Sequence, residues 1–110
     1  MPISARARIE IYLPDVPKKI YRRAQRAFER EFLETFGGCT VIKGIKGLYL
    51  SAEGKPETDK IVLLYAETPF EFRKNRAALS KYTDELRDVA YQATGEESIL
   101  IVVHEIYHSV

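Results

Sequence analysis

The sequence predicts an α+β domain with the ferredoxin-like order β-α-β-β-α-β. In this fold a four-stranded, mostly antiparallel sheet carries both helices on one face. Two helical patterns, each ended by glycine, alternate with extended segments. The chain has 110 residues, of which 45% are hydrophobic and 30% charged. We therefore expect one domain over residues 1–110 with a single core.

Residues 7–13 predict the first strand, because apolar and polar side chains alternate there, with one face buried and the other in water. The strand ends at residues 14–17, where Asp15 is expected to cap the first helix. Glycines 37 and 38 are expected to end that helix. Its core side chains recur at spacings of three and four: Ile20, Ala24, Ala27, Phe28, Phe32 and Phe36.

Residues 40–42 and 48–50 are predicted to be extended, and Gly44 and Gly47 between them predict a bulge or a close backbone approach. A polar turn over residues 52–58 leads to an apolar strand, 60–66, expected in the middle of the sheet.

The second helix is predicted to begin with Thr68 as its cap and Pro69 in its first turn, and to end at Gly95. Its expected core stripe is Leu79, Tyr82, Leu86, Val89, Ala90 and Ala93. Residues 98–108 are rich in β-branched side chains and predict the last strand.

Composition restricts the function classes. The net charge of +1 indicates no general attraction to nucleic acid or acidic membranes. No apolar run reaches the length of a membrane span, and the start of the chain lacks the apolar region of a signal peptide. Cys39, the single cysteine, excludes an internal disulfide. We therefore expect a cytoplasmic protein without membrane partners.

The segment His104-Glu105-Ile106-Tyr107-His108 matches the H-E-x-x-H pattern of zinc proteases. That chemistry needs a helix, which stacks the two histidines one turn apart. On the predicted strand they are roughly 13 Å apart, too far to share a zinc ion. The glycines of the chain also lack the G-x-x-x-x-G-K-[ST] spacing of a phosphate loop. We therefore expect neither a metal nor a cofactor.

Several short motifs resemble a family of uncharacterised bacterial proteins. They are residues 36–41, Phe-Gly-Gly-Cys-Thr-Val, then Gly47-Leu48-Tyr49, Gly54 and the apolar strand 60–64. Residues 97–100 also resemble that family's entry to its last strand. The chain departs from the pattern at Tyr49, where tryptophan is common, and at residues 58–59, where an arginine-glutamate pair is common. The resemblance implies the fold and no known reaction.

The last strand supplies the leading functional prediction, a non-catalytic binding protein. If Ile99, Ile101 and Val103 face the helices, the opposite face is too apolar for open solvent and indicates an interface. We therefore predict a homodimer, or a complex with another protein, through this open sheet face. The expected interface residues are Leu100, Val102, His104, Ile106 and His108.

A basic stripe on the first helix supports a weaker alternative, binding of nucleic acid or phosphate. Its members are Lys19, Arg23, Arg26 and Arg30. Glutamates 29, 31 and 34 lie close by, and opposite charges on a helix surface commonly pair, which is typical of a solvated face.

Two enzyme hypotheses remain. Thr40, Tyr49 and Asp59 could line a pocket beside the glycine-rich second strand. Alternatively, Pro2, once freed of Met1, could act as a general base of the tautomerase type, with Arg6 and Arg8 holding a substrate carboxylate. The first strand, however, is clear only from Ala7, whereas such enzymes begin their strand at the proline itself.

Overall fold

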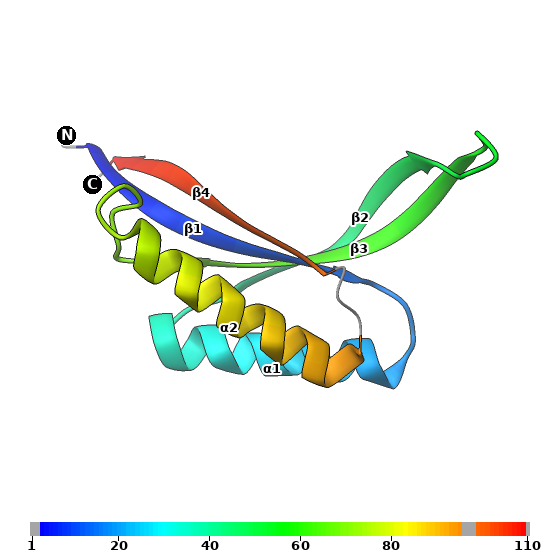
Figure 1. The fold of residues 1–110 in the computed structure, drawn as a ribbon, viewed down its shortest axis with the longest axis horizontal. Coiled ribbons are helices and arrows are strands. Elements are labelled where there is room, and N and C mark those ends of the chain that lie inside the picture. The colour runs from blue at the N-terminus through cyan, green and yellow to red at the C-terminus, as the bar shows by residue number, and fades with distance from the viewer. Residues whose placement is uncertain (1–2, 96–98, 110) are drawn as a thin grey trace.

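The computed structural model describes residues 3–95 and 99–109, with side chains for 5–95 and 99–107. Six elements follow one another in the predicted order (Figure 1). They are β1 (Ile3–Pro14), α1 (Lys19–Phe36), β2 (Thr40–Leu50), β3 (Pro56–Glu67), α2 (Arg76–Thr94) and β4 (Leu100–Ser109).

The four strands form one sheet in the order β2-β3-β1-β4, and every pairing in it is antiparallel. Both helices lie on the same side of this sheet (Figure 1). The ferredoxin-like prediction is therefore confirmed, as is the placement of the third strand inside the sheet.

The core lies between the helices and this covered face. Ala7, Ile9, Ile11 and Leu13 of β1 are at most 1% exposed, because alternate residues of a strand point to the same side. The side chains that meet them from the other elements are Ala24, Phe28, Phe32, Val62, Leu64, Ala66, Leu79, Leu86, Ala90, Ile99 and Ile101. Most of the predicted helix stripes are thus confirmed.

The start of α1 differs from the prediction. The helix begins at Lys19 after an N-cap at Lys18, which makes no side-chain capping bond, so Asp15 is not the cap. Tyr21 is buried, whereas Ile20 is 36% exposed, since Tyr21 continues the spacing of the buried Ala24 and Phe28 toward the N-terminus. The predicted end is confirmed: Gly37 has the left-handed φ of 77°, and its N–H donates to the carbonyl of Leu33.

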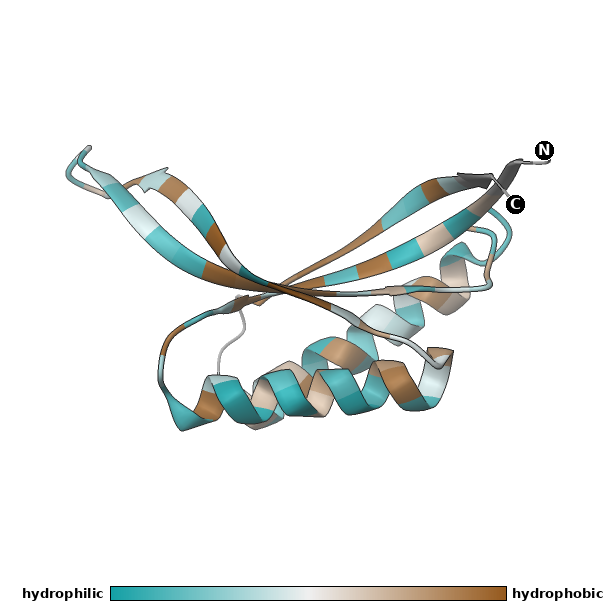
Figure 2. Ribbon diagram, turned by 180° about the vertical axis from the view of Figure 1, so that it is seen from behind, coloured by the Kyte–Doolittle hydropathy of each residue, from teal (hydrophilic) through white to brown (hydrophobic). Residues whose placement is uncertain are grey.

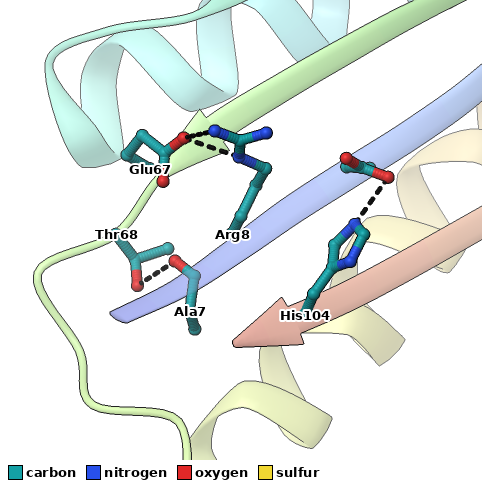
Figure 3. A network of polar contacts seen from close by, with 6 residues as sticks. Ala7, Arg8, Glu67, Thr68 and His104 are labelled. Carbon is teal, nitrogen blue, oxygen red and sulfur yellow. Dashed lines mark hydrogen bonds and ion pairs between the residues drawn. The ribbon is translucent and has the colours of Figure 1, made fainter. Parts of the chain in front are cut away.

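The second helix begins later than predicted. Thr68 is 1% exposed, and its hydroxyl donates to the carbonyl of Ala7 at 2.9 Å (Figure 3). The backbone N–H of Thr68 donates to the same oxygen, and Phe70 accepts from the N–H of Ala7. These bonds hold the segment against β1, so α2 begins only at Arg76. Gly95 ends the helix as predicted.

The predicted bulge in β2 is confirmed. Gly44 has a φ of +76°, and the pairing with β3 shifts register between Ile42 and Ile45. At Gly47 the neighbour is a side chain and not a backbone, because a Cβ there would lie 2.9 Å from Cδ1 of Ile61. A side chain at this position would displace the end of the Ile61 side chain.

Beyond the bulge, β2 and β3 form an arm that extends past the helices (Figure 1). Hydrophobic and hydrophilic residues alternate along it (Figure 2). Leu48 and Leu50 are 73% and 71% exposed there, since no helix reaches them. In the described part of the chain, neither helix has a segment apolar and long enough to cross a bilayer.

Candidate functional site

The candidate site is the face of the sheet that the helices leave uncovered, called the open face below. The strands bend away from the helices toward both ends of the sheet, so this face is concave (Figures 1 and 2). Alternation within each strand assigns its side chains: the neighbours of the buried Ile11, Leu64 and Ile101 point to the open side.

Apolar side chains occupy much of the open face. On β4 they are Leu100, 56% exposed, and the half-buried Val102 and Ile106. The apolar side chains from the other three strands are Tyr12, Ile42, Ile45, Ile61, Leu63 and Tyr65. An apolar surface that spans several strands is typical of a protein interface.

One ion pair crosses this face between its two central strands. Arg8 of β1 and Glu67 of β3 are direct register partners. The guanidinium donates from Nε to Oε1 of Glu67 at 2.6 Å, and its Nη2 also contacts this oxygen (Figure 3). The same guanidinium lies 4.3 Å from the ring centre of Tyr65, a cation–π contact. These contacts give the guanidinium of Arg8 its partners within the chain itself.

A second cluster surrounds Glu10, which is only 6% exposed. The Tyr12 hydroxyl donates to Oε1 of Glu10 at 2.8 Å. Nε2 of His104 lies 2.8 Å from the same oxygen, a contact drawn as the dashed line from His104 in Figure 3. The bond to this carboxylate, followed by burial, raises the pKa of Tyr12, because both disfavour a phenolate. The prediction of a water-exposed second face for β1 is therefore wrong at Glu10.

Sequence reasoning did not find this cluster. The sequence does show that Glu10 and Tyr12, two residues apart in a strand, share one face and can contact each other. Their link to His104, and that of Arg8 to Glu67, depends on how the strands pair across the sheet. That register is a tertiary property.

The structure places the predicted interface residues together. Leu100, Val102, His104 and Ile106 alternate along β4 and lie on the open face. His108 pairs with Ser4 in the strand backbone, and its side chain is outside the described residues. The extended tail, on which the rejection of the zinc-protease pattern depended, is confirmed. The proposed base Pro2 lies outside the described residues.

The three residues of the pocket hypothesis do not converge. Thr40 and Tyr49 stand near opposite ends of β2, which separates them by roughly 30 Å at the rise of a strand. Tyr49 donates to Glu57 at 2.9 Å across the arm, and this bond to a carboxylate raises its pKa. Asp59 lines a cavity of about 300 Å³ with Tyr12 and Leu100, and neither Thr40 nor Tyr49 borders it.

The basic stripe lies on the exposed surface of α1, where Lys19, Arg23, Arg26 and Arg30 are all exposed. Only Arg26 of these four borders the largest of the three described cavities. Lys19, Arg23 and Arg30 thus lie on the solvated helix face outside the cavity, and Arg26 lies at its border.

Comparisons with known proteins support the architecture. No family model and no curated protein matches the sequence. Among solved structures, CutA1 of Oryza sativa superposes with a TM-score of 0.59 at 19% identity, covering 93% of this chain and 80% of the rice protein. The divalent cation tolerance protein CutA1 of Thermus thermophilus gives a TM-score of 0.57 at 16% identity, covering 94% of this chain and 84% of the bacterial protein.

A third match is CPII of Thiomonas intermedia K12, solved with ADP, AMP and acetate bound. Its TM-score is 0.55 at 16% identity, and the match covers 100% of this chain and 94% of CPII. At identities this low, the structural superpositions establish a common fold alone. The resemblance to the uncharacterised bacterial family stays a prediction, because no family model supports it. The chain is thus a small domain with the fold of CutA and CPII.

Proposed function

We propose that the protein is a non-catalytic binding protein that self-associates through the open face of its sheet. The observation that carries this proposal is the composition of that face. Near its centre Arg8 is paired with Glu67, the buried carboxylate of Glu10 has two polar partners, and the side chains around them are apolar. A surface of this kind can lose its water while each of these charged groups keeps a polar partner, whereas a buried charge without a partner is costly.

The arm adds a second apolar surface. Leu48 and Leu50 project from the side of the arm opposite the open face, and β2 is an edge strand of the sheet. Exposed apolar edge strands readily pair with other chains. We propose that the arm of one copy contacts the next, so that the concave face and the arm act together. The composition favours the cytoplasm as the place where this occurs.

A catalytic function has less support. The pairing of His104 with Glu10 could orient a general base. However, neither Glu10 nor His104 borders any of the three described cavities, so none of these cavities presents the pair to a substrate. We therefore propose that His104 serves as a polar partner for the buried carboxylate of Glu10 within the interface.

The test is the mass of the protein in solution. Light scattering of the native chain should give a multiple of the 12.6 kDa monomer. Leu100→Glu should shift the mass to that of one chain, because the new carboxylate would be buried among apolar side chains. The thermal midpoint should stay close to that of the native chain measured when dilute, since Leu100 is 56% exposed in the monomer.

The matched control is Tyr91→Glu, which introduces the same charge at a 49% exposed position on the helix layer. This variant should keep the native mass. A native mass of one chain throughout the micromolar range would overturn self-association, as would equal dissociation by both variants.

A further inference from the structure

The largest of the three described cavities lies on the helix side of the molecule, away from the open face. Its volume is about 490 Å³, and it lies between the β1–α1 connection, the first half of α1 and β2. The connection contributes Pro14, Asp15, Val16 and Pro17 to its wall. The cavity is therefore built by three separate parts of the chain.

Three cations border this cavity: Arg22, Arg26 and Lys43. On α1 the lining residues Arg22, Gln25, Arg26 and Glu29 follow the spacing of one helix face. Lys43 comes from β2 and directly precedes Gly44, whose φ of +76° creates the bulge. Helix periodicity and the bulge together bring these like charges to one site.

None of the ion pairs found among the described residues involves Arg22, Arg26 or Lys43. On the open face, in contrast, Arg8 is held by Glu67. The first turn of α1 contains no acidic residue that would offset its positive end. Like charges gathered without partners repel one another, and a bound anion would relieve this repulsion.

The same cavity also presents Asp15 and Glu29. Carboxylates accept hydrogen bonds from hydroxyl groups and repel a continuous polyanion such as a nucleic-acid backbone. This combination suits a compact ligand with one strongly anionic end and one hydroxylated end. Phosphate esters of small polyols have this chemistry, and arginine is well suited to bind their phosphate in a bidentate manner.

We propose that this cavity binds a small phosphate ester. Its phosphate lies among Arg22, Arg26 and Lys43, and its hydroxyl groups donate to Asp15 or Glu29. This site differs from the nucleic-acid surface predicted from the basic stripe, because Lys19, Arg23 and Arg30 do not border the cavity.

Calorimetric titration of the full chain with glycerol 2-phosphate tests the proposal, and inorganic phosphate serves as a second probe. The native chain should bind the ester more tightly than the free ion. Lys43→Gln should weaken ester binding about tenfold, and Arg22→Gln combined with Arg26→Gln should weaken it more. Amide shifts on adding the ester should concentrate on residues 14–29 and 43.

The matched control combines Arg23→Gln with Arg30→Gln, which removes two charges from the same helix outside the cavity. It should change ester affinity less than about twofold, the screened effect expected of distant surface charges. Asp15→Asn with Glu29→Gln should reduce the preference for the ester over inorganic phosphate.

Three results would overturn the proposal. They are absence of ester binding by the native chain, equal losses in the cavity and control variants, and tighter binding of a DNA duplex that depends on Lys19, Arg23 and Arg30. The last result would favour the basic stripe instead. Because this cavity and the open face share no charged residue, ester binding and self-association can fail independently.

Discussion

The two faces of the sheet differ although the same strands build both. On the covered face of β1, Ala7, Ile9 and Ile11 are completely buried by the helices. On the open face of the same strand, Arg8 and Glu10 are paired with Glu67 and His104, and apolar side chains surround them. The covered face is thus a core that the chain completes by itself. The open face resembles a core from which one layer is missing.

The largest difference between the faces should appear when buried volume is removed. Ile11→Ala should lower the free energy of unfolding by about 2–5 kcal/mol, because Ile11 is 0% exposed and a cavity would remain. Leu100→Ala on the open face should stay within about 0.5 kcal/mol in dilute, monomeric protein. Urea denaturation measures both. Equal losses would show that the open face is already packed in the monomer.

The polar cluster of the open face should be next in size. His104→Ala leaves the carboxylate of Glu10, 6% exposed, with Tyr12 as its hydrogen-bond donor. We expect a loss of about 1–3 kcal/mol at neutral pH, the usual cost of a buried group that loses a partner. The double variant Glu10→Gln with His104→Ala should recover part of this loss in urea denaturation. A double variant as unstable as the single one would argue against buried charge as the cause.

A smaller effect is expected at the bulge of β2, which shapes the arm. Gly44→Ala should cost about 1 kcal/mol, because its φ of +76° disfavours a Cβ although nothing lies within 4 Å. Gly38→Ala is the matched control, with the same open space and no positive φ, and it should cause no loss. Thermal denaturation compares the two variants. Equal midpoints would mean that the backbone at Gly44 adapts freely.

The smallest effect concerns the ionisation of tyrosines. The main cause of their raised pKa differs between the two faces of the sheet. On the helix side, burial is the main cause that raises the pKa of Tyr82 to about 12, whereas on the open face the Glu10 carboxylate is the main cause for Tyr12. A pKa raised above the ordinary 10.0 means that the folded state holds the proton more tightly. This contribution is complete below pH 10 and is lost as the pH rises toward 12.

Tyr82→Phe should therefore reduce the decline of stability between pH 10 and about 12. Tyr12→Phe removes the other tyrosine and should have the smaller effect on this decline. Urea denaturation at a series of alkaline pH values checks the slopes. An unchanged slope for Tyr82→Phe would contradict burial of this hydroxyl.

Local patterns predicted most of the architecture. The alternation in β1, the stripes of both helices, the glycine ends at 37 and 95, and the bulge at 44 all appear in the structure. The predicted starts of the helices were wrong. Asp15 lies too far before Lys19 to act as the cap, and the hydroxyl of Thr68 bonds to the Ala7 carbonyl of a distant strand. A capping pattern in the sequence does not show such a competing long-range partner.

The candidate site could be predicted only in part. The alternation along β4 placed Leu100, Val102, His104 and Ile106 on one face, which the structure confirms. The burial of Glu10 and the meeting of Lys43 with Arg22 and Arg26 at one cavity were not predicted. Each depends on side chains that come together from different elements.

The amino-acid sequence by itself determined which segments are helices or strands and which of their side chains are apolar, because these follow from periodicity within a few residues. Only the tertiary structure decided which polar groups meet. Arg8 joins Glu67, and Glu10 joins His104, through strand pairings between residues far apart in the chain. A shift of one residue in either pairing would turn these side chains to opposite faces, so the open face exists only in the folded sheet.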